Sequence, residues 1–192
     1  MTTRAPLALF TLTTLFGGFA FAQVPPELLG LGNSTLEAID SSKLQAPSGG
    51  GWADIGNGNS EGLGCVVSFI STTGADEIGD TFGLIGPATK EHAEKGIGLV
   101  VFTGRRIPPA AQDGRLERIT ILSDEAPNTT RAMHYSNGEM NVFMVPVQIN
   151  AMLEASNPEE SIGIVFNGEE VYRVNITAYN EGRVKMRDCM RG

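Results

Sequence analysis

The sequence predicts an α+β fold: one antiparallel, β-rich domain, meander or sandwich-like, with a short helix near residues 147–156 and a C-terminal helix. From Cys65 onward, short runs of β-type residues alternate with turn residues, and most connections are short and contain Gly, Asn or Asp. Such connections join antiparallel strands, because parallel strands need long crossover segments. The 192-residue chain, shortened by a leader, has the length of one domain.

The leader is the stretch Met1–Ala22, which has the pattern of a secretory signal peptide. Arg4 supplies a positive start, Leu7–Phe21 is mainly apolar, and an Ala-Phe-Ala tripeptide precedes Gln23. A retained membrane anchor is the alternative, but two glycines interrupt the apolar run. We expect cleavage before Gln23 and no stable membrane insertion afterwards, because the longest remaining apolar run, Ile97–Phe102, is too short to span a bilayer.

The charge balance restricts the partners. The chain has 14 Lys and Arg against 22 Asp and Glu, a formal net charge of −8. Nucleic acids and anionic membranes both favour clustered basic residues, so neither is expected as the main partner. The partner predicted from composition is an unknown protein or a small ligand.

The chain contains two cysteines, Cys65 and Cys189. In an oxidising compartment an even number of cysteines favours a disulfide, whereas in the cytosol the same pair would be two free thiols. The signal peptide decides between these readings, and we predict a bridge from Cys65 to Cys189.

We divide the mature chain into a flexible N-terminal segment, residues 23–54, and a globular β-rich domain, residues 55–192. The first segment is rich in Pro and Gly, which interrupt regular structure. The domain holds eight candidate strands, each a β-type run bounded by turn residues: Cys65–Ser71, Thr81–Ile85, Gly98–Phe102, Arg115–Leu122, Thr130–Ser136, Glu139–Val145, Ile162–Phe166 and Glu170–Ala178.

The dipeptide at residues 137–138, Asn-Gly, suits a two-residue hairpin turn. Pairing outward from it places Tyr135 opposite Met140 on an apolar face that should point to the core. The same register places His134 opposite Asn141 on the outer face.

Two helices complete the fold. Pro146 can begin the first, because its missing donor is harmless in a first turn, and Ser156-Asn157-Pro158 ends it. The second should run from Tyr179 to Met190, with an apolar stripe that includes Cys189. The predicted disulfide would then tie the C-terminal helix to the first predicted strand.

His134 is the candidate site residue, because histidine is the usual general base and only two are present. The other, His92, lies in a charged stretch typical of a solvated loop or helical turn. Ser60 lies in a Gly-x-Ser-x-Gly match. A hydrolase nucleophile in this motif lies between a strand and a helix, and the sequence around Ser60 predicts neither a preceding strand nor a following helix. We assign no catalytic residue, no metal site and no cofactor.

Residues 145–189 combine a helix bearing Ile149, Met152 and Leu153, the β-type runs Ile162–Phe166 and Val171–Ala178, and a terminal helix. In this pattern of apolar spacing they resemble the C-terminal half of the invasion-associated locus B family of bacterial periplasmic proteins. The mid-chain cysteines of that family are absent. The resemblance implies an exported, β-rich domain concerned with the envelope or with host interaction, and it supplies no catalytic residues.

We therefore expect a periplasmic or secreted protein of bacterial origin that acts as a non-enzymatic binding or interaction module. A small exported hydrolase or isomerase with His134 at its site is one alternative. A structural or inhibitor-like protein that blocks a partner with an exposed loop, such as Thr103–Gly114, is another.

Overall fold

The structure, a computed structural model, describes residues 50–73, 77–124, 126–137 and 140–192. The predicted signal peptide and nearly all of the predicted N-terminal segment lie outside the described residues. The elements in chain order are β1 (Gly51–Asn57), β2 (Cys65–Thr73), β3 (Glu77–Ile85), α2 (Lys90–Lys95), β4 (Ile97–Gly104), β5 (Arg115–Leu122), β6 (Asn128–Asn137), β7 (Met140–Gln148), α3 (Ile149–Glu154), β8 (Glu160–Phe166), β9 (Glu169–Ile176) and α4 (Tyr179–Arg191).

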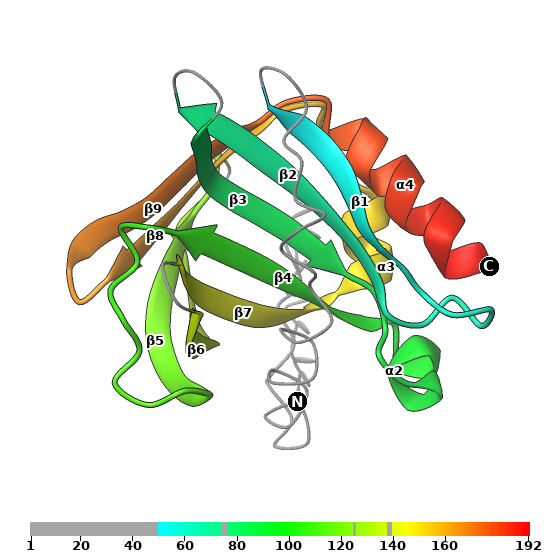
Figure 1. Ribbon diagram of the computed structural model, residues 1–192, viewed down its shortest axis with the longest axis horizontal. Coiled ribbons are helices and arrows are strands. Elements are labelled where there is room, and N and C mark those ends of the chain that lie inside the picture. Colours follow the sequence, from blue (N-terminus) through cyan, green and yellow to red (C-terminus); the bar gives the residue numbers. More distant parts are fainter. Residues whose placement is uncertain (1–49, 74–76, 125, 138–139) are drawn as a thin grey trace, which may run out of the picture.

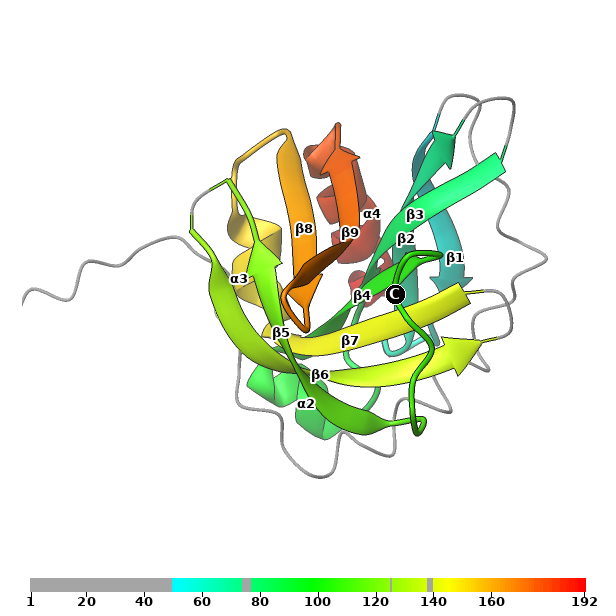
Figure 2. The same ribbon diagram turned by 90° about the vertical axis from the view of Figure 1, so that its left-hand side faces the viewer.

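The strands form one curled antiparallel sheet in the order β1-β2-β3-β4-β7-β6-β5-β8-β9. The predicted fold class is therefore confirmed. The curl brings β9 back towards β3, where the Tyr172 hydroxyl donates to the Thr81 carbonyl over 2.8 Å. Figure 2 shows the resulting half-barrel, with α4 behind β8 and β9.

One strand was not predicted. Residues 51–54, which the sequence places in the N-terminal segment, form the first half of β1, and β1 pairs with β2 along its length. The three glycines before Trp52 resemble a linker, so the sequence did not predict a strand there. Trp52 and Ile55 are both buried but belong to different core clusters, and Ile55 lies at an irregularity in the register between Asp54 and Gly56.

The main core fills the inside of the curl. Trp52 stacks on Tyr179 of α4 at 5.5 Å between ring centroids, and Phe82 meets both rings edge-on. The same interior holds Phe102 and Phe143. Because large rings occupy this space, the half-barrel is a packed core.

A second buried cluster lies on the opposite face of the strands. In β7 the side chains alternate strictly, with Phe143 and Val145 in the main core and Val142 and Met144 in the second cluster. This alternation follows from the two-residue period of a strand. Both faces of the central strands are therefore apolar.

The β6–β7 hairpin has a different register from the predicted one. Tyr135 pairs with Val142, and Met140 pairs with Asn137. Because the shift is two residues, the side chains that the prediction grouped on one face still share a face. The prediction chose the wrong face for the main core, however: the main core lies on the His134 side, and Tyr135 belongs to the second cluster.

The two predicted helices are present as α3 and α4. Pro146 does not begin α3, because it continues β7 opposite Leu99. The charged stretch around His92 forms α2, which has no buried residue. No helix in the described part of the chain is long and apolar enough to cross a membrane.

Candidate functional site

The candidate site is the β4–β5 loop, residues 105–114, which crosses from one layer of the curl to the other (Figure 1). Two consecutive prolines, Pro108 and Pro109, prevent it from forming a strand or a helix. Ile107 is 0% exposed and belongs to the main core. The loop is therefore anchored by one apolar side chain that points inward.

His134 of β6 holds the loop from its inner side, which faces the main core. Its Nε2 lies 2.9 Å from the Pro108 carbonyl oxygen, and because a carbonyl can only accept, Nε2 must carry the proton. The ring packs against Phe143 at 4.3 Å and Phe166 at 5.6 Å between centroids. At 2% exposure His134 lies on the inner face, which corrects the outer position predicted from the sequence.

Two further residues hold the loop, Asn141 of β7 and Ser136 of β6. Asn141 is buried and donates to the Ile107 carbonyl over 2.7 Å. The Ser136 hydroxyl accepts from the Ala110 amide at 2.7 Å, and the Ser136 amide donates to the Asp113 carboxylate at 2.8 Å. These bonds satisfy backbone groups that a loop without regular structure leaves unpaired.

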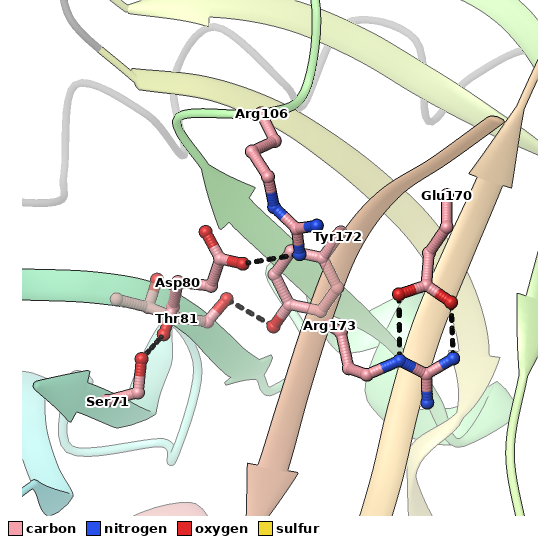
Figure 3. A network of polar contacts seen from close by, with 7 residues as sticks. All are labelled: Ser71, Asp80, Thr81, Arg106, Glu170, Tyr172 and Arg173. Carbon is pink, nitrogen blue, oxygen red and sulfur yellow. Dashed lines mark hydrogen bonds and ion pairs between the residues drawn. The ribbon is translucent and has the colours of Figure 1, made fainter. Parts of the chain in front are cut away.

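Arg106 joins the loop to the seam between β3 and β9. Its guanidinium lies 3.6 Å from the Asp80 carboxylate, which is itself only 16% exposed. Figure 3 shows Arg106 reaching towards Asp80 beside Tyr172, while on β9 Glu170 binds Arg173 through both carboxylate oxygens. Along this seam the charges of Arg106 and Arg173 are paired with the carboxylates of Asp80 and Glu170.

Burial sets the electrostatics of the site. It lowers the pKa of His134, an effect that the Pro108 hydrogen bond and the charges of Glu117 and Asp113 only partly oppose. The neutral imidazole is therefore the favoured form. Burial likewise raises the pKa of Tyr172 well above its ordinary value, which keeps its hydroxyl protonated as a donor.

The loop presents its other side to solvent. Arg105, Pro109, Ala111 and Gln112 are exposed. The residues that hold the loop come from β6 and β7, whereas the exposed ones come from the loop itself. The arrangement is a surface loop of defined shape with basic, apolar and amide groups at its tip.

The Gly-x-Ser-x-Gly match around Ser60 has a structural explanation. Ser60 is exposed in the β1–β2 loop, whose glycines fit around the disulfide and the end of α4. A side chain at Gly62 would start 2.1 Å from the Met190 carbonyl oxygen, and one at Gly58 would start 2.8 Å from the Cys65 sulfur. These glycines therefore explain the Gly-x-Ser-x-Gly match without a nucleophile.

The predicted disulfide is confirmed: Cys65 and Cys189 are bonded. A surface hollow of about 290 Å³ lies beside Cys189, lined also by Asp54 and Lys185, whose charged groups pair at 3.1 Å. Among the described residues no group of three or more His, Cys, Asp or Glu side chains is placed to hold a metal ion.

Sequence reasoning singled out His134 and the loop separately and did not connect them. It missed Asn141 and Ser136 as residues that hold the loop, and Asp113 as the loop carboxylate that Ser136 binds. One signal was available: His134, Ser136 and Asn141 share a strand face with Phe143 and Val145, and polar side chains on a core face need partners.

No protein-family model, no curated protein and no solved structure is significantly similar to this chain. The resemblance of residues 145–189 to the invasion-associated locus B family therefore stays a prediction.

Proposed function

We propose that this chain is a non-enzymatic binding module of the bacterial envelope or exterior, and that it recognises its partner through the tip of the β4–β5 loop. The observation that carries the proposal is the asymmetry of this loop. Its inner side is bound by His134, Asn141 and Ser136, and its outer side is exposed. A loop ordered before binding loses less conformational entropy on association.

The filled interior supports recognition at the surface. Trp52, Phe82, Phe102 and Tyr179 occupy the space in which a larger half-barrel would hold a small molecule. Loops supported by a rigid scaffold are where proteins commonly place binding residues. The disulfide is consistent with an oxidising compartment, as the proposed location requires.

The partner makes contact with Arg105, Pro109 and Gln112. Arginine donates several hydrogen bonds in a fixed geometry, glutamine both donates and accepts, and proline adds a stiff apolar surface. An inhibitor-like protein would use the same residues and would differ only in that its partner is an enzyme.

The test compares loop-tip variants with a matched surface variant. Arg105→Ala/Gln112→Ala removes tip contacts and keeps the residues that hold the loop. Lys90→Ala/Glu94→Ala changes two exposed residues of α2. Captured from an envelope extract, a genuine partner should be lost with the tip variant and retained with the α2 variant.

The enzyme alternative is tested in parallel. If the purified protein hydrolyses or isomerises members of a substrate panel, and His134→Gln abolishes the activity while the fold is preserved, the binding proposal is wrong. Equal capture by the tip variant and the unaltered protein would also contradict it.

A further inference from the structure

The outer face of the β5–β6 hairpin carries a pair of arginines directly opposite each other. Arg118 pairs with Arg131 in the antiparallel register. Their neighbours in sequence, Ile119 and Ala132, are buried in the main core, so the arginines project from the opposite face, where both are exposed. Opposite residues in such a pair have Cβ atoms about 5 Å apart.

This pair differs from every other arginine in the described part of the chain. Arg106, Arg115 and Arg173 each pair with a carboxylate. Arg183, Arg187 and Arg191 have carbonyl or carboxylate partners, and Arg105 also has an interaction. Arg118 and Arg131 make no side-chain hydrogen bond or ion pair with the described residues.

The arrangement has an electrostatic cost. Like charges opposite each other across two strands destabilise the pair, and no carboxylate among the described residues forms an ion pair with either arginine. The chain has more acidic than basic residues, with a net charge of −8, so the two arginines lie together without an ion pair although carboxylates outnumber basic groups in the chain. An anion bound between the two guanidinium groups would remove the repulsion and satisfy donors on both sides.

The next row of the same face adds hydroxyl groups. Thr120 pairs with Thr129, and their Oγ1 atoms lie 2.9 Å apart. In this hydrogen bond one hydroxyl donates and the other accepts, so the accepting hydroxyl keeps its own proton available for donation. Two guanidinium groups and one spare hydroxyl form a compact set of donors.

We propose that Arg118 and Arg131, with the Thr120–Thr129 pair, bind an oxyanion: a phosphate or sulfate group. Planar guanidinium groups match the oxygens of such groups bidentately, and two of them suit a doubly charged anion better than chloride. The site lies on the strands rather than on the β4–β5 loop, so it is a second site beyond the proposed function.

The test is a titration of the isotope-labelled protein with potassium phosphate and potassium sulfate, followed by nuclear magnetic resonance. Potassium chloride at matched ionic strength is the reference. Saturable shifts should concentrate on β5 and β6 around Arg118 and Arg131 and on the side-chain Nε signals of these arginines. Glycerol phosphate and vesicles containing phosphatidylglycerol then distinguish a soluble ester from a lipid headgroup as the source.

Variants make the assignment specific. Arg118→Gln and Arg131→Gln should each weaken phosphate binding about fivefold, the effect of one exposed ion pair, and the double variant should lose the saturable response. Thr129→Val should weaken binding and preserve the strand. Arg191→Gln removes an exposed arginine from α4 as the matched control and should bind normally.

Three results would overturn the proposal. Chloride could produce the same shifts as phosphate at equal ionic strength. The double variant could retain the response, or Arg191→Gln could weaken it as much as the hairpin variants do, which would reveal an unspecific effect of net charge.

Discussion

The two sides of the curled sheet are closed in different ways. On one side α4 is joined to β2 by the Cys65–Cys189 disulfide and to β1 by the stacking of Tyr179 on Trp52. The β4–β5 loop lies on the other side (Figure 1), and hydrogen bonds from side chains of β6 and β7 hold it there. We expect the covalent and apolar contacts to supply global stability that does not depend on pH, and the polar contacts to fix the shape of one loop without deciding whether the sheet folds.

The largest effect should come from removing the disulfide. The cysteines are 124 residues apart, and in the chain-entropy model closing such a loop stabilises the folded state by about 5 kcal/mol. Cys65→Ala/Cys189→Ala should therefore lower the free energy of unfolding by several kcal/mol, measured by urea titration of Trp52 fluorescence. Below the unfolding transition, hydrogen exchange in the β4–β5 loop should be unchanged. A loss of less than about 1 kcal/mol would mean that α4 holds this side without the bond.

Gly182→Ala tests the apolar part of the same side. A Cβ at Gly182 would lie 2.4 Å from the Trp52 ring, so α4 and β1 must separate to admit it. Overpacking commonly costs about 1–3 kcal/mol, and the gain in helix propensity returns up to about 1 kcal/mol. We expect a net loss of about 1–2 kcal/mol in urea unfolding. Val184→Ala, at an exposed position of the same helix, is the control, and a Gly182 variant as stable as that control would contradict the close approach.

The disulfide side was largely predictable from the sequence. The cysteine count together with the predicted signal peptide indicated the bond, and the apolar stripe indicated α4. The strand β1 was missed, since three glycines precede Trp52 and resemble a linker. The contact that requires Gly182 joins residues 130 positions apart in the chain, and no local pattern encodes it.

Asn141→Ala tests the polar side. The buried Asn141 amide is the donor to the Ile107 carbonyl, and its loss leaves a buried acceptor unpaired, at a cost of about 1–3 kcal/mol. Hydrogen exchange should accelerate in residues 105–114 more than in the strands, because the loop loses an anchor while the sheet persists. Asn175→Ala, an exposed position in β9, is the matched control. Uniform acceleration throughout the sheet would show that the loop has no independent stability.

The polar side was predictable only in parts. The sequence marked His134 and the loop as candidates and predicted the strands on both sides. It placed His134 outward because the hairpin face with Met133 and Tyr135 is more apolar, and both faces of these strands prove to be buried. Hydrogen bonds between a loop and strands some 26 residues away depend on the curl of the sheet, which periodicity does not encode.

The smallest effect should be a pH dependence that is confined to the polar side. Burial lowers the pKa of His134 in the folded protein, so near and below about pH 6.5 the unfolded chain binds more protons than the folded chain. The contribution of neutral His134 to stability is thus complete above its ordinary pKa and is lost as the pH falls through that value towards the lowered one. Urea unfolding at about pH 7.5 and about pH 5.5 should show a smaller acid-induced loss for His134→Gln, whose amide can still donate to Pro108, than for the unaltered protein. His92→Gln, in helix α2, which has no buried residue, is the control substitution at the other histidine. An identical loss in all three proteins would show that closure of the loop does not depend on the neutral imidazole.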